Sequence, residues 1–194
     1  LFCGLFVSAS LVAQQPGHTV GADGRYVFNK RFSTLKDLPK FSAWDSLPNG
    51  RWVQLYADGK VALEYTLKNH LMNGPAKGFY PDGKLRFECT FYDNFIDGAF
   101  KEYYPTGELY KLYNYNQGFL SGDWFIYYKD GKKSAQGFAK DDSQEGKLYH
   151  WWPNGNLKEE RLYKNNNLDG MTYYWYEHGL KMMEGPQFGI DNKV

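Results

Sequence analysis

Hydrophobic and polar residues alternate along most of this chain in short runs separated by turn residues. From Leu85 to Phe91 (LRFECTF), apolar residues occupy every second position. Such alternation indicates a strand with one buried face. A shorter aromatic run precedes each alternating run, and a turn such as Pro81-Asp82-Gly83 separates the two. The pattern therefore predicts a succession of β-hairpins.

The hairpins recur every 24 residues, as the step from Gly59 to Gly83 shows. The predicted structural turn glycines are Gly59, Gly83, Gly107, Gly131, Gly155 and Gly179. A second set at the same period is Gly50, Gly74, Gly98, Gly122, Gly146 and Gly170. Residues 51–194 are therefore six tandem units, which is the signature of a repeat architecture.

The fold class predicted from this period is all-β: an elongated, single-layer antiparallel β-meander of about twelve strands. The second connection in each unit, for example YDNFIDG, is polar and is expected to be a longer loop ending on the second glycine. No window in the units keeps the spacing of an amphipathic helix.

The units resemble MORN-type repeats in the variant common in bacteria, which reads roughly G-x-W-x-x-Y-Y-x-x-G-x-L-x-x-E. The residues carrying the resemblance are GDWFIYYKDG from Gly122, GAFKEYYPTGEL from Gly98 and NGNLKEE from Asn154. The resemblance implies a twisted β-meander used as an interaction or scaffolding surface. Many bacterial members are labelled antitoxin components, which implies a protein partner. The last unit departs from the pattern at Gly185-Pro186, so its second strand is expected to fray or to act as a cap.

The N-terminal residues 1–13 (LFCGLFVSASLVA) are apolar and uncharged, and too short for a transmembrane helix. They resemble the end of a truncated secretory signal peptide, with cleavage after Ala13, and predict an exported periplasmic or extracellular protein without a transmembrane span in the mature chain. A buried N-terminal strand is the alternative. Lipid anchoring through Cys3 is less favoured, because Phe2 is too large for the usual attachment site.

Residues 14–24 are predicted to be a polar linker, and residues 25–50, which are out of register with the units, an N-terminal cap. A strand is expected from Arg25 to Phe32 and one helical turn within residues 35–44. An open array needs such a cap, because its first strand would otherwise expose unpaired backbone groups.

Charge and cysteine content narrow the function classes. The formal net charge is +1, from 23 basic and 22 acidic residues, so no basic stripe for nucleic acid is predicted. Only Cys89 remains after removal of the signal segment, which excludes an internal disulfide in the mature chain.

The usual catalytic and metal-binding patterns do not occur. The histidines, His18, His70, His150 and His178, occupy unrelated positions of the unit, so no metal or other cofactor is predicted. One unit position carries carboxylates at Glu64, Glu88, Glu160 and Glu184 and is broken by Leu112 and Gln136. We interpret this row as a solvated face with Glu opposite Lys on neighbouring strands. No nucleophile has a matching base at motif spacing, and the prediction is a protein that is not an enzyme.

Aromatic residues on both sides of each turn are the candidate binding residues. A three-residue Pro-Asp-Gly loop would pair Tyr80 with Lys84 and put Phe79 beside Leu85. One aromatic set then packs with the apolar side: Leu55, Phe79, Tyr103, Tyr127, Trp151 and Trp175. The other set turns to the opposite face as a candidate binding strip: Tyr56, Tyr80, Tyr104, Tyr128, Trp152 and Tyr176. A two-residue loop would swap the two sets, and cross-strand packing alone is the competing interpretation.

Two functions compete on this evidence. The first is a non-enzymatic module that binds an unidentified protein along the sheet. The second is a glycan or cell-wall binding module that stacks sugars on Trp151-Trp152 and on residues 173–176. The units lack the Gly-Trp pair that opens choline-binding repeats, which counts against the second function.

Overall fold

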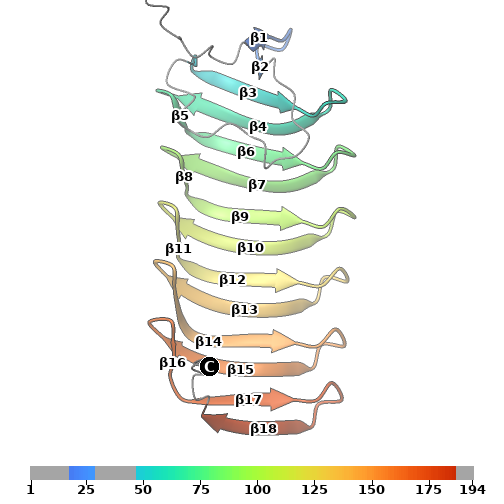
Figure 1. Ribbon diagram of the computed structural model, residues 1–194, viewed down its shortest axis with the longest axis vertical. Coiled ribbons are helices and arrows are strands. Elements are labelled where there is room, and N and C mark those ends of the chain that lie inside the picture. Colours follow the sequence, from blue (N-terminus) through green and yellow to red (C-terminus); the bar gives the residue numbers. More distant parts are fainter. Residues whose placement is uncertain (1–17, 29–46, 187–194) are drawn as a thin grey trace, which may run out of the picture.

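The computed structural model describes residues 18–28 and 47–186, which form one continuous sheet without helices (Figure 1). The predicted signal segment, the predicted helical turn and residues 187–194 lie outside the described residues. The strands are β1 His18–Val20, β2 Tyr26–Phe28, β3 Gly50–Leu55, β4 Val61–Lys68, β5 Leu71–Met72, β6 Gly74–Phe79, β7 Leu85–Tyr92, β8 Phe95–Ile96, β9 Gly98–Tyr103, β10 Leu109–Asn116, β11 Phe119–Leu120, β12 Gly122–Tyr127, β13 Lys133–Lys140, β14 Ser143–Trp151, β15 Leu157–Lys164, β16 Asn167–Leu168, β17 Met171–Trp175 and β18 Lys181–Pro186.

The long strands follow one another as an antiparallel meander, and the predicted fold class is confirmed. In Figure 1 the hairpins stack along the long axis in chain order, with all six turns on one edge. Each hairpin pairs with its predecessor in the chain and with its successor, for example β6 with β4 and with β7. The last strand, β18, is described from Lys181 to Pro186, so the second strand of the sixth unit is present.

The turn inside each hairpin is the predicted three-residue loop. Tyr80 N donates to Lys84 O at 2.8 Å, Gly83 N donates to Tyr80 O at 2.8 Å, and Phe79 pairs with Leu85. Gly83 has a φ of 88°, a conformation that favours glycine because it has no Cβ. The five equivalent glycines also have positive φ.

The second connection differs from the expected long loop. Asp93 and Asn94 form a two-residue turn with φ of 48° and 72°, which short polar side chains tolerate. The chain then returns as β8, which pairs with the end of β7, and Gly98 redirects it into β9. Asn94 N donates to Met72 O in the preceding unit at 2.9 Å, so these turns also stack along the array.

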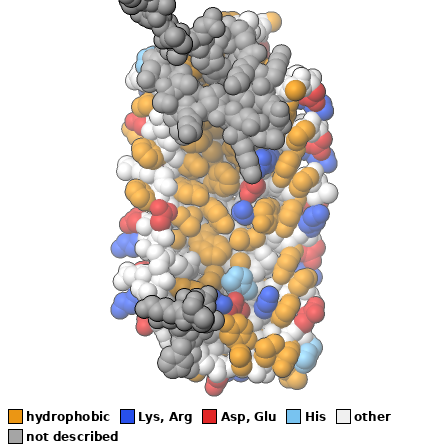
Figure 2. Space-filling view, in the orientation of Figure 1, with side chains coloured by type: hydrophobic (Ala, Val, Ile, Leu, Met, Phe, Trp, Pro, Cys, Tyr) orange, Lys and Arg blue, Asp and Glu red, His pale blue; other side chains and the backbone are white. Residues whose placement is uncertain are grey.

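Side-chain direction alternates along each strand, so the register assigns every residue to one of two faces. We call one of them the core face. Its buried side chains pack together at the N-terminal end of the array: Trp52, Leu63, Tyr65, Leu67, Met72, Ala76 and Cys89, with Phe87, Phe91, Ile96 and Phe100 against them. In Figure 2, hydrophobic side chains gather along the middle of the visible face, and charged and histidine side chains interrupt them toward the C-terminal end.

The other face, which we call the row face, is defined by one line of directly paired residues that crosses the sheet. This central row contains Glu64, Lys77, Glu88, Lys101, Leu112, Phe125, Gln136, Tyr149, Glu160, Tyr173 and Glu184. Its first part alternates Glu with Lys, and Lys101 Nζ lies 3.4 Å from Glu88 Oε1. The predicted pairing of Glu with Lys on neighbouring strands is therefore present in that part of the sheet.

The prediction that Phe79 and its equivalents pack with the apolar side is wrong, because each turn contains a bulge. Gly78 pairs with Phe87, and the next residue, Phe79, pairs with Leu85. Gly78 and Phe79 are neighbours and point to opposite faces. Their partners, Phe87 and Leu85, must therefore also lie on opposite faces, although they are two positions apart, because the bulge interrupts the usual alternation. Phe87 packs on the core face, which places Phe79 on the row face.

The same register shift occurs in all six hairpins. Leu55, Phe79, Tyr103, Tyr127, Trp151 and Trp175 therefore lie on the row face. The set that begins with Tyr56 was predicted to face away from the apolar side, and this is also wrong. Tyr80 is two positions after Gly78 and therefore points to the same side, that of the core face. It lies at the turn edge, where the Arg86 guanidinium is 5.8 Å from its ring centre.

Strands β1 and β2 extend the sheet beyond the first hairpin. β1 pairs antiparallel with β2, and β2 pairs parallel with β3, which makes the sheet mixed at this end. Tyr26 stacks on Trp52 with ring centroids 4.9 Å apart. Part of the stretch predicted as a linker, β1, thus belongs to the same sheet.

Candidate functional site: two aromatic rows

The row predicted as a binding strip forms a ladder along the turn edge. Each aromatic side chain donates a hydrogen bond to a backbone carbonyl of the next unit, 23 residues later. The bonds are Tyr56 to Phe79 O (2.6 Å), Tyr80 to Tyr103 O (2.7 Å), Tyr104 to Tyr127 O (2.8 Å), Tyr128 to Trp151 O (2.7 Å) and Trp152 Nε1 to Trp175 O (3.0 Å). We call these residues the turn-edge ladder.

Lysine side chains reinforce the ladder at the same edge. Lys60 Nζ donates to Pro81 O at 2.8 Å, and Lys84 and Lys132 make the equivalent bonds in later units. These bonds satisfy carbonyl groups at the ends of the hairpins, which would otherwise depend on water. Partial burial raises the pKa of the Tyr80, Tyr104 and Tyr128 hydroxyls. The ladder therefore joins neighbouring units, and its role in binding stays a prediction.

Tyr176, the last member of the predicted strip, has a different environment. Its ring is 46 % exposed and stacks on His178, with centroids 5.4 Å apart. Among the described residues its hydroxyl has no hydrogen-bond acceptor in a following unit. It is thus the most exposed residue of the predicted strip and lies outside the turn-edge ladder.

A second aromatic group lies on the row face of the last three hairpins. Phe125 stacks on Tyr127, Tyr149 on Trp151, and Tyr173 lies against Trp175, with ring centroids 6.3, 5.7 and 6.1 Å apart. We call these six residues the aromatic platform. Each pair comes from positions i and i+2 of one strand, which share a face. Successive pairs are two strands apart, about 10 Å at the usual strand spacing.

Lysine ammonium groups lie over one ring of each platform pair. Lys133 Nζ is 4.8 Å from the Phe125 ring centre, Lys147 Nζ is 5.9 Å from that of Tyr149, and Lys181 Nζ is 4.5 Å from that of Tyr173. Such cation–π contacts orient the ring and place positive charge at its face. All six platform residues remain partly exposed. The platform can therefore offer aromatic and cationic groups together.

Half of the platform was missed at the level of sequence. The positions of Phe125, Tyr149 and Tyr173 are occupied by Lys77 and Lys101 in earlier units, so they do not recur as an aromatic column. The signal that marks them is their place two residues before Tyr127, Trp151 and Trp175. Other exposed apolar side chains extend the row face toward its second edge, including Phe95, Phe119 and Phe138.

A charged cluster occupies the core face near the C-terminal end. Glu159 is 7 % exposed, pairs with the Arg161 guanidinium and lies 3.0 Å from His150 Nδ1. Arg161 also donates to the Tyr163 and Tyr174 hydroxyls. Burial lowers the pKa of His150, against the opposite effect of Glu159. Because Glu159 is held by Arg161, this cluster is suited to buried charge pairing rather than to acid–base chemistry.

Two further features have no candidate among the described residues. Within residues 18–28 and 47–186, no group of three or more His, Cys, Asp or Glu side chains is placed to hold a metal ion. The same residues contain no helix of the length and apolarity that a membrane crossing requires.

The sequence of the units agrees with this architecture. A family model for the MORN repeat variant matches residues 72–94, 96–117 and 144–165. Each matched stretch covers the strands of one unit. A comparison with curated proteins finds no match.

Proposed function

We propose that this chain, a protein of MORN repeats of the variant type, is a non-enzymatic module that binds another protein through the aromatic platform. MORN repeats are commonly protein- or membrane-binding modules, which is compatible with a repeat scaffold. The proposal places the contact on the row face, where the structure puts Tyr127, Trp151 and Trp175.

The observation that supports the proposal most directly is the contrast between the two aromatic rows. The polar atoms of Tyr80, Tyr104 and Tyr128 are bonded within the array. The platform rings instead stack in pairs on a partly exposed face. Partly exposed Tyr and Trp side chains provide large contact areas at low entropy cost, which is why they dominate binding energies at protein interfaces.

The charges around the platform favour a partner with a polar rim. Lys147 Nζ lies 2.7 Å from Glu160 Oε1, so the surroundings of the platform include an ion pair in addition to the lysines over its rings. Aromatic anchors surrounded by such pairs are typical of protein interfaces, whose centre is apolar and whose rim is charged.

The test is capture of a partner from cells of the source organism by the tagged full chain. We expect one protein to be retained by the unaltered chain and to be lost with Trp151→Ser. An interface aromatic of this kind contributes about 2 kcal/mol or more to binding. The retained protein is then expressed and its affinity measured by calorimetry.

The matched control is Tyr176→Ser, which removes an exposed aromatic side chain from the turn edge instead of the platform. We expect binding to be unchanged in this variant. Equal loss in both variants, or no retained protein in any extract, would remove the support for the platform as the interface.

A glycan ligand is the second candidate, and the regular spacing of the platform pairs favours it. Stacked pairs at about 10 Å are suited to contact a linear polysaccharide repeatedly along its chain. The measurement is Trp fluorescence during titration with peptidoglycan fragments and common polysaccharides, compared between the unaltered chain and Trp151→Phe. The double variant Trp151→Phe, Trp175→Phe is the control. If the fluorescence change is the same in this double variant, it comes from another tryptophan and contradicts this candidate.

We also propose that the protein is exported, on the basis of the apolar segment 1–13. Expression of the full coding sequence followed by cell fractionation and mass determination tests this point. Recovery of the intact, uncleaved chain from the cytosol would contradict it.

A further inference from the structure

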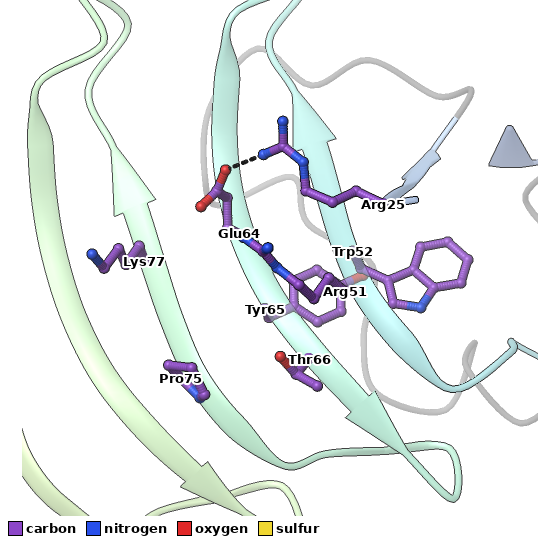
Figure 3. A pocket seen from close by; sticks show the side chains of 8 residues that line it. All are labelled: Arg25, Arg51, Trp52, Glu64, Tyr65, Thr66, Pro75 and Lys77. Atoms are coloured by element: carbon purple, nitrogen blue, oxygen red, sulfur yellow. Dashed lines mark hydrogen bonds and ion pairs between the residues drawn. The ribbon is translucent and has the colours of Figure 1, made fainter. Parts of the chain in front are cut away.

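A cavity of about 490 Å³ lies at the N-terminal end of the row face, away from the aromatic platform (Figure 3). It is lined by Arg25, Arg51, Trp52, Glu64, Tyr65, Thr66, Pro75 and Lys77. These residues come from the segment before β2 and from strands β3, β4 and β6. The rings of Trp52 and Tyr65 belong to the core face, so the polar side chains form the accessible lining.

The cavity contains three cationic side chains and one carboxylate. Arg25 Nη1 donates to Glu64 Oε1 at 2.5 Å, and Arg25 also pairs with Asp23 outside the cavity. In Figure 3, Glu64 lies between Arg25 and the strand that carries Lys77. The single carboxylate of the lining is therefore already bonded to one of the three cations.

The two remaining cations have no partner of opposite charge within ion-pair distance among the described residues. Arg51 is exposed and makes no ion pair or side-chain hydrogen bond there. Lys77 is directly opposite Glu64 and Glu88 in the register, yet both carboxylates pair with other cations, Arg25 and Lys101. Within the part of the chain that the structure describes, two positive charges therefore face one cavity without an ion pair of their own, although Lys77 helps to lower the pKa of the nearby Glu88.

We propose that this cavity binds a phosphate monoester, a function beyond the protein contact proposed for the platform. A phosphate monoester has nearly two negative charges at neutral pH, which matches the two cations, Arg51 and Lys77, that make no ion pair among the described residues. The Arg51 guanidinium offers a planar fork of donors that fits phosphate oxygens, and Lys77 adds a point charge. The Thr66 hydroxyl provides a neutral donor, and the remaining volume accommodates the esterified group.

Titration of the full chain with glycerol phosphate, followed by calorimetry and amide NMR, tests the proposal. We expect saturable binding, with shifts confined to residues around Arg51, Thr66 and Lys77. Arg51→Gln is expected to weaken binding about tenfold or more, because a charge-assisted hydrogen bond is lost. Lys77→Gln is expected to weaken it about threefold, as the loss of a point charge near the surface.

Two further variants separate this site from general attraction of anions. Lys164→Gln removes an exposed lysine far along the array that makes no ion pair among the described residues, and it should leave binding unchanged. Glu64→Gln removes the carboxylate that competes for the cations and should strengthen binding. Absence of saturable binding at about 10 mM ligand, equal losses in Lys77→Gln and Lys164→Gln, or weaker binding in Glu64→Gln would each overturn the proposal. Circular dichroism verifies that each variant folds.

A soluble ester and a lipid headgroup present the same phosphate chemistry, and vesicles distinguish the two sources. Co-sedimentation with vesicles that contain phosphatidic acid, lost in Arg51→Gln, would assign the lipid source. Binding of glycerol phosphate without co-sedimentation would assign a soluble ligand.

Discussion

The Tyr103 hydroxyl donates a hydrogen bond of 2.8 Å to Glu88 Oε1 in the preceding unit. Glu88 belongs to the central row, so this bond independently places the Tyr103 side chain on the row face. Burial, followed by the bond to Glu88, raises the pKa of Tyr103 to about 12. The same bond is the main cause of a lowered pKa at Glu88, to which Lys101 also contributes.

Replacing Tyr103 by Phe should raise the pKa of Glu88 toward its ordinary value of 4.5. Since the lowered pKa of the folded state favours the ionised carboxylate, Glu88 stabilises the fold above its unfolded pKa, and this stability is lost as pH falls through the folded value. Tyr103→Phe should therefore lose less stability than the unaltered chain between neutral and acidic pH. Carboxyl NMR titration of Glu88 is the measurement, and an unchanged pKa would show that the bond is absent in solution.

Tyr128→Phe should destabilise the array by about 0.5–1.5 kcal/mol, the usual net contribution of one hydrogen bond. The variant removes the ladder bond to Trp151 O and keeps the ring. The adjacent Tyr127 is its control, because among the described residues its hydroxyl has no hydrogen-bond partner. Urea denaturation should show little change in Tyr127→Phe. The ladder would lose its assigned role if the two variants were equally stable.

Gly107→Ala should cost about 1–2 kcal/mol through backbone strain, since a left-handed conformation disfavours a Cβ. Gly107 has a φ of 110°, and a Cβ built there meets no atom within 4 Å, so steric contact is not the cause. Gly185→Ala is the control, because that position is equally open and lacks a positive φ. Denaturation compares the two variants.

The location of the damage in Gly107→Ala tests how the units cooperate. Contacts in a repeat array are made with nearest neighbours, so hydrogen exchange should accelerate in the unit of Gly107 and the two units beside it. Uniform acceleration over all units would show instead that the array unfolds as a single cooperative body.

The stability of the C-terminal end should depend on the protonation of His150. Burial lowers its pKa from 6.5, which favours the neutral ring in the folded state. The unfolded chain binds the proton more readily, so stability is present above the unfolded pKa and decreases as pH falls below it. The unfolding midpoint in urea should fall from pH 8 to pH 5 less in His150→Gln than in the unaltered chain. An NMR titration that gives His150 a pKa above 6.5 would contradict the predicted lowering and the pH dependence drawn from it.

The Cys89 thiol should be unreactive in the folded protein. It is 6 % exposed, and burial raises its pKa to about 12, so almost no thiolate is present at neutral pH. In a Cys3→Ser background, iodoacetamide should modify Cys89 only after denaturation. Rapid modification under native conditions would mean that the N-terminal hairpins open frequently.

The sequence predicts the hairpin period, the turn type and the strand order, because these depend on local residues such as Pro81 and Gly83. It does not predict which face Phe79 occupies, since the bulge changes the parity of side chains across the turn. The consequence was an inverted assignment of the two aromatic sets. The face that each side chain occupies beyond a bulge depends on which residue is left unpaired. The alternation of apolar and polar residues does not reveal that residue.

The cavity lined by Arg25, Arg51 and Lys77 could not be predicted from periodicity either. Arg25 lies outside the units, and its pairing with Glu64 depends on the parallel contact between β2 and β3. Half of the platform was contained in the sequence analysis as an alternative: if the two aromatic sets exchange faces, Tyr127, Trp151 and Trp175 take the face opposite the apolar side. Its other half arises only when Lys77 and Lys101 are replaced by Phe125 and its equivalents in later units.

The 23-residue offset of the ladder bonds makes the length of this protein adjustable in whole units. Excision of residues 99–122 would join Gly98 to Asp123 and bring the Tyr80 hydroxyl to the carbonyl of Tyr127 in place of that of Tyr103. The same donor and acceptor positions would meet again, so every remaining unit keeps its bonds. In-frame duplication or loss of this segment in a gene would therefore yield homologues that differ in reach, with the same cap and the same final hairpin.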